Sequence, residues 1–399
     1  MDPVRNPYAP GAGQRPPELA GRDRELAAFD VVLERVARGR PERSLVLTGL
    51  RGVGKTVLLN ALRSQAIRRQ WGTGKIEARP DQSLRRPAAA ALHMAVRELA
   101  PRHRDPERVD AVLGVLKAFA LRDGAGGTGK LRERWQPGID VPAAVGRGDS
   151  GDIEIDLVEV LVDAASLATD VGSGIALFVD EMQDVPPPDV SALCAACHEL
   201  SQLGAPLIVV GAGLPHLPAV LSASKSYSER LFRYLRIDRL ERAAADRALS
   251  APADEEGVTF TPDALAALYA ATEGYPYFVQ AYGKVAWDLA AASPVSGDDV
   301  RMAVPEAEAE LAVGFFGSRY ERATPAEREY LRAIADLGAA RDDGPVPTAD
   351  VATALARKPS SLSPARDSLI KKGLVYSAER GLIAFTVPHF GRFLRAQPS

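Results

Sequence analysis

The sequence predicts an α/β protein in three parts: a parallel sheet, a helical domain and a small α+β domain. Short apolar strands alternate with amphipathic helices from about residue 44 to 211. Helical spacing continues from about 240 to 312, and short helices followed by a β-hairpin occupy about 325–395. Because regular strand–helix alternation places helices on both sides of a sheet, we expect a parallel sheet covered on both faces.

The composition is that of a soluble globular chain. Of 399 residues, 46% are hydrophobic and 25% are charged, which disfavours disorder and is enough for two or three domains. The formal net charge of -3 excludes a global basic field. Two cysteines are too few for a disulfide framework, which favours a cytoplasmic location. With no signal peptide and no run of about 18 apolar residues, we expect no membrane contact.

The elements of the first part follow from the spacing of apolar residues. Residues 1–17 are rich in proline and glycine, which disfavour a helix, so we expect an extended arm. The predicted strands are 44–48, 76–79, 175–180 and 206–211, and the predicted helices are 22–38, 55–70, 88–99, 106–117, 153–169 and 190–203. We interpret the irregular, Gly-rich residues 118–150 as a surface hairpin with arms at Phe119–Arg122 and Leu131–Val141.

The first strand leads directly into a phosphate-binding pattern. G-x-x-x-x-G-K-[ST] is filled at every fixed position by Gly49, Leu50, Arg51, Gly52, Val53, Gly54, Lys55 and Thr56, with Val57 next in the helix. Glycines let the backbone approach phosphate oxygens, and the helix start adds the positive end of its dipole. We expect Lys55 to reach the β- and γ-phosphates of ATP, and Thr56 to bind Mg²⁺. The flanking strand and helix favour a P-loop NTPase sheet over a structural glycine turn.

Two other glycine-rich segments have part of this pattern. Gly124–Lys130 has the same spacing, but Leu131 stands where Ser or Thr is needed, so we interpret it as the tip of the hairpin. Gly72–Lys75 is shorter and is predicted to be a turn between a helix and a strand.

A second acidic motif follows about 125 residues later, where the apolar strand 175–180 ends in Asp180 and Glu181. Carboxylates at the carboxyl end of a parallel strand lie beside the phosphate loop. Asp180 is expected to hold Mg²⁺ through water, and Glu181 to orient and polarise the attacking water. The alternative is a solvated turn. Gln183 and Asp184 either reach the γ-phosphate or cap the next helix.

With both motifs in place, the chain resembles the AAA+ superfamily of P-loop ATPases. Within it, the sequence is most similar to the initiator-type and archaeal-type ATPases and to the signal-transduction (STAND) ATPases. The resemblance covers about 18–395 and is most specific in the two Walker motifs. Besides a C-terminal winged-helix pattern, it is carried by Gly21–Leu26 (GRDREL), 178–184 (FVDEMQD), Val209–Pro215 (VVGAGLP) and Gly274-Tyr275-Pro276.

The resemblance implies a division of the chain and further site residues. It implies an ATPase core at 18–238, a helical lid at 239–322 and a winged helix at 323–399. Residues 21–26, with Arg22, are implied to line the adenine side of the pocket, and Tyr275 and Pro276 to begin the lid helix that closes over the nucleotide. ATP and Mg²⁺ are the implied cofactors.

The sequence also departs from the family pattern. The usual polar residue at the end of the fourth strand is replaced by Gly211-Ala212-Gly213, and no sensor arginine lies near Gly274. Arg230 and Arg233 are candidates for an arginine finger, with a helix-surface arginine as the alternative for each. These departures favour slow or partner-stimulated hydrolysis.

The C-terminal part reads as a helix-turn-helix followed by a β-hairpin, the pattern of a winged helix. Its predicted helices begin at Thr324-Pro325, Pro347-Thr348 and Ser361. Residues 325–399 contain eleven Lys/Arg and eight Asp/Glu. The candidates for DNA contact are Arg366, Lys371, Lys372 and Arg380. Protein docking is the alternative use of such a module.

The sequence therefore predicts an ATPase that acts as a molecular switch. Its expected partners are ATP and ADP, duplex DNA through the winged helix, a protein, or further copies of the chain. One alternative is a nucleotide-gated scaffold with little or no hydrolysis. Another is a phosphotransferase, which the acidic pair, the lid and the winged helix disfavour.

Overall fold

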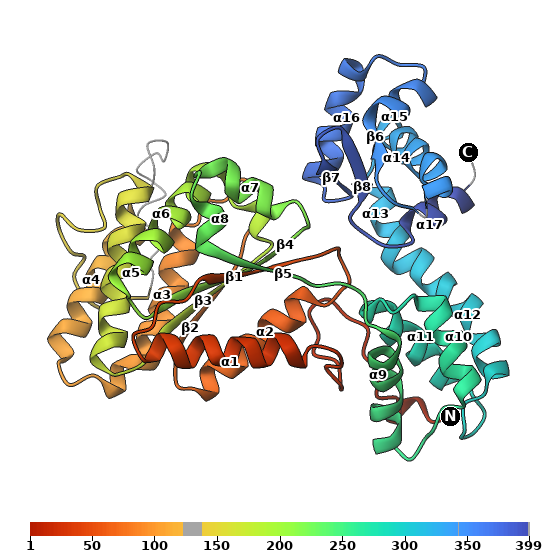
Figure 1. The fold of residues 1–399 in the computed structure, drawn as a ribbon, viewed down its shortest axis with the longest axis horizontal. Coiled ribbons are helices and arrows are strands. Elements are labelled where there is room, and N and C mark those ends of the chain that lie inside the picture. The colour runs from red at the N-terminus through yellow and green to blue at the C-terminus, as the bar shows by residue number, and fades with distance from the viewer. Residues whose placement is uncertain (123–137, 342, 398–399) are drawn as a thin grey trace.

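A computed structural model describes residues 1–122, 138–341 and 343–397 of the chain. One half is a sheet flanked by helices, and the other contains a helical domain, which we label the lid, and a small C-terminal module (Figure 1). Figure 1 also shows that the N-terminal arm leaves the sheet half and lies against the lid helices.

The central sheet has five parallel strands in the order β2-β3-β4-β1-β5. The strands are β1 (Ser44–Thr48), β2 (Gly72–Glu77), β3 (Ile175–Asp180), β4 (Leu207–Gly213) and β5 (Phe232–Arg236). Thr48, the last residue of β1, lies opposite Gly213 of β4 and Arg236 of β5. The carboxyl ends of the strands therefore meet at one edge, where the phosphate loop begins.

Helices cover both faces of the sheet, as predicted. They are α1 (Asp23–Ala37), α2 (Lys55–Arg68), α3 (Arg85–Leu99), α4 (Pro106–Leu121), α5 (Ile153–Asp170), α6 (Pro187–Leu203), α7 (Leu217–Ser224) and α8 (Ser228–Leu231). Successive strand residues alternate between two cores: Leu45 and Leu47 pack with α1 and α2, whereas Val46 belongs to the larger core that contains α3 to α6. This period of two is what a sheet buried on both faces requires.

Strand β5 was missed by sequence analysis, because it is an edge strand. Its residues Phe-Arg-Tyr-Leu-Arg mix buried and exposed positions, and only Phe232 is fully buried. The expectation of a helical surface at Arg233 was therefore wrong, since Arg233 lies within this strand.

The predicted turn at Gly72–Lys75 was also wrong, because these residues form the first part of β2. The glycines are explained by helix α3, which approaches the strand backbone directly. A Cβ on Gly74 would lie 2.5 Å from the Ala91 carbonyl oxygen, and one on Gly72 would lie 2.7 Å from that of Ala95.

The hairpin predicted for 118–150 is not supported where the structure describes it. Helix α4 continues to Leu121, so Phe119–Leu121 is helical and not a strand, and residues 138–152 contain no strand. Residues 123–137, which include Gly124–Lys130, lie outside the described residues.

The lid and the C-terminal module share one continuous apolar core, which includes Trp287, Phe316 and Phe390. The lid helices are α9 (Arg242–Glu255), α10 (Pro262–Thr272), α11 (Pro276–Leu289) and α12 (Gly297–Leu311), followed by a π-helical segment (Ala312–Gly317) and α13 (Ser318–Glu321). The C-terminal module contains α14 (Pro325–Gly338), β6 (Val346–Pro347), α15 (Thr348–Ala354), α16 (Pro359–Lys371), β7 (Val375–Glu379), β8 (Leu382–Phe385) and α17 (Phe390–Ala396). Strand β8 pairs antiparallel with both β6 and β7.

The N-terminal arm is mostly extended, apart from a 3₁₀ turn at Pro3–Arg5, and it is not a free tail. Tyr8 is buried in the lid core, and its hydroxyl donates a 2.5 Å hydrogen bond to the Leu249 carbonyl oxygen. No helix among the described residues is long and apolar enough to cross a membrane.

We predict that Gly74→Ala destabilises the sheet half. The added methyl would overlap the Ala91 carbonyl oxygen, and overpacking of this kind costs about 1–3 kcal/mol. A thermal melt followed by circular dichroism should show a lower melting temperature. Gly314→Ala is a matched control, because nothing lies within 4 Å of a Cβ there. Equal melting temperatures for the Gly74 variant and wild type would contradict the packing account.

Candidate nucleotide site

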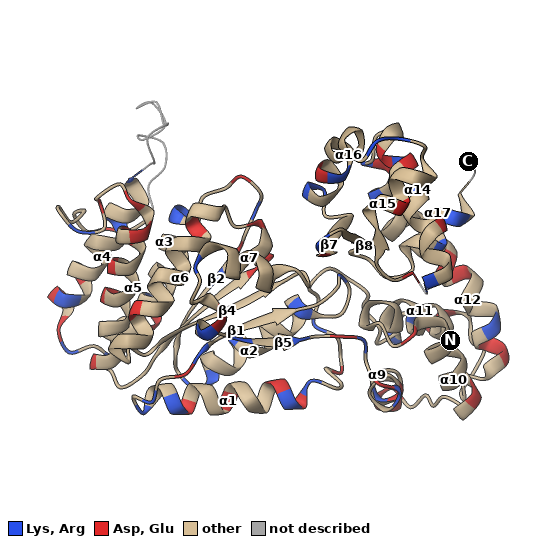
Figure 2. Cartoon of the chain, turned by 45° about the horizontal axis from the view of Figure 1, so that its top comes forward, with Lys and Arg blue, Asp and Glu red and all other residues tan. Residues whose placement is uncertain are grey.

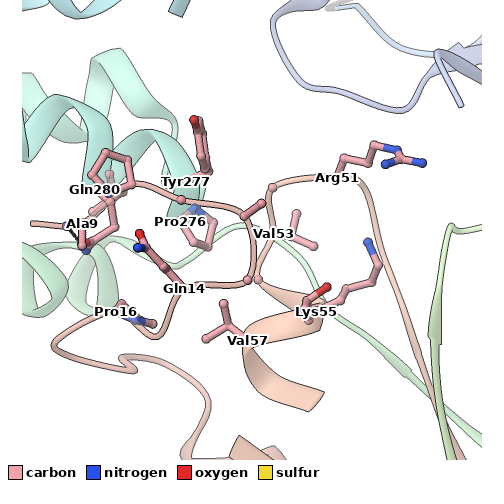
Figure 3. Close-up of a pocket in the computed structure, with 18 of the residues that line it drawn as sticks. Ala9, Gln14, Pro16, Arg51, Val53, Lys55, Val57, Pro276, Tyr277 and Gln280 are labelled. Carbon is pink, nitrogen blue, oxygen red and sulfur yellow. Dashed lines mark hydrogen bonds between the residues drawn. The ribbon is translucent and has the colours of Figure 1, made fainter. Parts of the chain in front are cut away.

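A cavity of about 300 Å³ opens at the carboxyl edge of the sheet, between the sheet half and the lid. Most of its lining comes from four segments: the loop residues 51–57, the N-terminal arm, the start of α11, and Phe315 with Arg319 beyond α12. In Figure 3, Gln14, Pro16 and Gln280 lie at one end of the cavity and Lys55 and Arg51 at the other.

The phosphate loop has the backbone that its glycines predict. Gly52 and Gly54 have φ angles of 85° and 88°, which residues other than glycine rarely adopt. Gly54 is the N-cap of α2. A Cβ on Gly49 would lie 2.1 Å from the Ile237 carbonyl oxygen. The loop is therefore closely packed from behind while its outer side faces the cavity.

Lys55 is a buried cation whose ammonium contacts the backbone of the phosphate loop. Its ammonium donates hydrogen bonds to the carbonyl oxygens of Gly49 (2.9 Å) and Leu50 (2.8 Å). Burial lowers the pKa of Lys55 to about 8, and the charge of Glu181 only partly opposes this effect. An anion in the cavity would favour the ammonium form.

Thr56 and Asp180, the two residues expected to hold Mg²⁺, are brought together. The Thr56 hydroxyl is hydrogen-bonded to the buried Asp180 carboxylate. Burial raises the pKa of Asp180, and this hydrogen bond opposes the rise. A hydroxyl and a carboxylate beside a phosphate loop are oxygen ligands of the kind that Mg²⁺ takes, with phosphate and water oxygens completing its shell. The residues present therefore fit the metal.

Glu181 lines the cavity, and both of its carboxylate oxygens have a partner. Gln183 donates a 2.6 Å hydrogen bond from Nε2 to Oε2, and Arg51 Nη1 lies 3.5 Å from Oε1. The backbone of Glu181 has a φ of 49°, a left-handed conformation that is uncommon for residues other than glycine.

The side chain of Gln183 does not cap the next helix, and its contact with a γ-phosphate stays a prediction. Its Oε1 accepts a 3.0 Å hydrogen bond from the backbone N–H of Leu214, which turns its Nε2 toward Glu181. Close packing at Gly211 and Gly213 leaves no room for the polar side chain that proteins of the family often carry at the end of this strand. A Cβ on Gly213 would lie 2.6 Å from Gln183 Oε1, and one on Gly211 would lie 2.4 Å from the sulfur of Met182.

Arg22 is among the residues that line the cavity, and its place on the adenine side stays a prediction. It is buried, and its guanidinium donates hydrogen bonds to the carbonyl oxygens of Val53 (3.1 Å) and Asp238 (2.7 Å). Arg22 therefore ties the phosphate loop to the segment that leads into the lid.

The start of the lid helix α11 also faces the loop, but not through every predicted residue. Pro276 lines the cavity, whereas Tyr275 is not among its lining residues and instead contacts Phe278 and His389. Tyr277 lines the cavity in its place, and its backbone N–H donates a 3.2 Å hydrogen bond to the Gly52 carbonyl oxygen.

Two groups of lining residues were missed by sequence analysis. The arm contributes Ala9–Gln14 and Pro16, although its composition predicts only an extended segment. Arg319 lies beside Phe315, with its guanidinium carbon 4.1 Å from the ring centroid. Burial lowers the pKa of Arg319, and the nearby Arg51 adds to the effect. Neither group carries a motif, so only the folded chain brings them to the loop.

The structure does not bring Arg230 to the cavity. Arg230 precedes Phe232, which pairs with Ser44, the first residue of β1, at the edge of the sheet opposite the phosphate loop. Arg230 therefore cannot contact a nucleotide in its own cavity, and a role as an arginine finger stays a prediction about a neighbouring copy of the chain.

The comparisons with known proteins fit this geometry. Residues 18–210 match the family model described as an AAA ATPase domain. The chain carries an AAA ATPase domain. Residues 313–394 match a family described as a domain of unknown function (DUF8462). A search among curated proteins finds no match.

Solved structures are similar to this chain over nearly its whole length. The Walker-type ATPase PABY2304 of Pyrococcus abyssi is 16% identical, covers 96% of this chain and 97% of its own, and has a TM-score of 0.56, which supports the fold. The Aeropyrum pernix ORC1 protein in complex with DNA is 18% identical over 96% of this chain and 94% of its own, with a TM-score of 0.44. The Thermotoga maritima RuvB Holliday junction branch migration motor is 16% identical over 97% and 100%, with a TM-score of 0.44.

We predict that the affinity of this AAA+ protein for ATP falls as the pH rises above about 8. The ammonium of Lys55 attracts phosphate, and its pKa of about 8 means that it is progressively neutralised above that pH. Affinity should approach a loss of about tenfold per pH unit in the alkaline range. Titration with a fluorescent ATP analogue from pH of about 7 to about 9 measures this. Lys55→Ala should bind weakly without this pH dependence, and a pH-independent wild type would contradict the prediction.

Proposed function

We propose that the chain is a molecular switch that binds Mg²⁺-ATP between its AAA ATPase domain and its lid, and hydrolyses it. The resulting change in the arrangement of its parts then acts on a DNA or protein partner through a C-terminal winged helix. One observation carries this proposal: the phosphate loop, Glu181 and the start of α11 line one cavity. A nucleotide in that cavity would contact the sheet half and the lid together, so its phosphate state can bias their arrangement.

Each residue of the site has a role in the proposed reaction. Lys55 exchanges the carbonyl oxygens of Gly49 and Leu50 for phosphate oxygens. Thr56 and Asp180 would hold Mg²⁺, which neutralises charge on the phosphates. Glu181 accepts the proton of the water that attacks the γ-phosphorus. The bond from that phosphorus to the β–γ bridging oxygen breaks, which gives inorganic phosphate and ADP.

The C-terminal module supports the proposed coupling through the order of its elements. Three helices are followed by the antiparallel pair β7–β8, with the short β6 beside β8, as a winged helix requires. Lys371 and Arg380 are exposed on α16 and in the turn between β7 and β8. We propose that these two cations contact the phosphates of duplex DNA.

A protein partner is the second candidate, because acidic neighbours pair with other basic residues of the module. Lys372 lies 2.6 Å from Glu327, and Arg366 lies 2.9 Å from Asp367. Burial alone would raise the pKa of Glu327, but hydrogen bonds from Lys372 and Ser368 lower it to about 2. Figure 2 shows both signs of charge interspersed over the module. Lys372 is therefore a weaker candidate for DNA contact than Lys371.

A nucleotide-gated scaffold is the alternative to an active ATPase, and the two partners of Glu181 favour it. Glu181→Gln separates these readings. If the chain hydrolyses ATP, this substitution should lower kcat by at least about 100-fold, because the general base is lost, while nucleotide binding persists. Steady-state phosphate release and a nucleotide titration measure the two effects. A wild type that binds ATP but shows no more turnover than Glu181→Gln, with or without DNA, would contradict hydrolysis and support the scaffold.

We predict that Lys371→Ala with Arg380→Ala weakens duplex DNA binding uniformly across sequences. Loss of two phosphate contacts should reduce the slope of log affinity against log salt by about two. Fluorescence anisotropy at several salt concentrations measures that slope. Arg97→Ala with Arg104→Ala is a matched control, because both residues are exposed on the sheet half. Absence of DNA binding by wild type would contradict a DNA partner and favour a protein partner for the module.

A further inference from the structure

The phosphate loop carries a cation that the nucleotide motif does not require. Arg51 occupies a variable position of the loop, and its Nη1 lies 3.5 Å from Glu181 Oε1. Gln183 holds the other oxygen of that carboxylate. Side-chain exposure of about 30% for Arg51 and 28% for Glu181 leaves the pair partly shielded from water. A carboxylate with both oxygens engaged in this way is poorly placed to accept a proton from water.

The backbone of Arg51 is held by the C-terminal module. Its N–H donates a 2.8 Å hydrogen bond to the carbonyl oxygen of Thr386, which follows β8. Thr386 is itself fixed, because it is fully buried and its hydroxyl donates a 2.7 Å hydrogen bond to the Gly373 carbonyl oxygen. A residue far along the chain therefore sets the backbone position of Arg51.

Two further contacts place the module against the site. Gly373 has a φ of 64°, and a Cβ there would lie 2.7 Å from Arg51 Nη2, so the backbone of the module directly adjoins the guanidinium. Nearby, the ring of Tyr376 on β7 stacks on that of His216, which follows β4, with centroids 6.0 Å apart and planes at 19°. The module thus contacts both the phosphate loop and the loop after β4.

We propose that Arg51 is a positioning residue that restrains the Glu181 carboxylate while the C-terminal module is docked on the phosphate loop. This inference rests on the proposed ATP hydrolysis. Undocking of the module, for example when its partner binds, removes the Thr386 hydrogen bond and the Gly373 contact. Arg51 is then free to leave Glu181, and the carboxylate can turn toward the attacking water.

The test compares Arg51→Ala, Arg51→Lys and Tyr376→Ala in the full chain. Steady-state ATP hydrolysis gives kcat and KM, and a fluorescent ATP analogue gives nucleotide affinity. Arg51→Ala should raise unstimulated kcat by about two- to fivefold, because a partly exposed ion pair is a modest restraint. Its KM and nucleotide affinity should change less than about twofold. Arg51→Lys should restore most of the restraint, since lysine still presents a cation to Glu181.

Tyr376→Ala tests the part played by docking. It removes the stack on His216 without touching the loop, and it should also raise kcat. The double variant with Arg51→Ala should gain no more than the larger single effect, because both substitutions release the same restraint. Arg301→Ala, on the exposed surface of the lid helix α12, is the control and should leave kcat unchanged.

Three results would overturn the proposal. A fall or no change in kcat for Arg51→Ala with nucleotide still bound would show that Arg51 does not restrain Glu181. A large loss of nucleotide affinity with unchanged kcat would make Arg51 a phosphate ligand. Additive effects of Arg51→Ala and Tyr376→Ala on kcat would show that the contact between Arg51 and Glu181 does not depend on docking of the module. No nucleotide binding in any sample would instead overturn the proposed function, and this inference with it.

Discussion

The burial of one ammonium group beside the phosphate loop governs the site. Lys55 is almost fully buried, and its charge is stabilised by two loop carbonyl oxygens and by the nearby carboxylates of Glu181 and Asp180. Desolvation makes this charge costly, as the lowered pKa shows, so an anion beside Lys55 would stabilise it. The surrounding segments keep water away from Lys55 and thereby strengthen its attraction for phosphate.

The phosphate loop is also where the separate parts of the chain meet. Arg22 holds the Val53 carbonyl oxygen, Tyr277 of the lid holds that of Gly52, and Thr386 of the C-terminal module holds the N–H of Arg51. These contacts fall on neighbouring loop residues. A nucleotide that shifts the loop would therefore change its hydrogen bonds to the lid and to the C-terminal module together. This arrangement gives the proposed switch a physical path from phosphate to partner.

Much of the sheet half could be predicted from the sequence, because strand and helix periods are local. Residues 44–48 and 175–180 each contain a continuous apolar run, and they were placed correctly. The start of β2 was misread because Gly72 and Gly74 look like a turn, whereas close packing of α3 requires them. Strand β5 was missed because its polar residues lie on an edge that only the folded sheet defines.

The residues of the candidate site also fall into two groups, those that a local sequence pattern predicts and those that only tertiary packing brings together. Gly49 to Thr56, Asp180 and Glu181 belong to motifs whose chemistry fixes their spacing, so sequence alone located them. The N-terminal arm, Tyr277 and Arg319 reach the cavity through tertiary packing, which no local pattern reports. The partners of Glu181 could not be predicted either, since they depend on the turn of Gln183 by Leu214 and on the docked position of Arg51.

The central claim is that Mg²⁺-ATP binds in the cavity shared by the phosphate loop, the arm and α11. Hydrogen exchange with and without Mg²⁺-ATP tests it most directly, because it reports binding and location together. The account predicts slower exchange in residues 51–57, in the arm at 9–20 and at the start of α11, three segments that line the cavity. Unchanged exchange in all three segments at saturating Mg²⁺-ATP would contradict it.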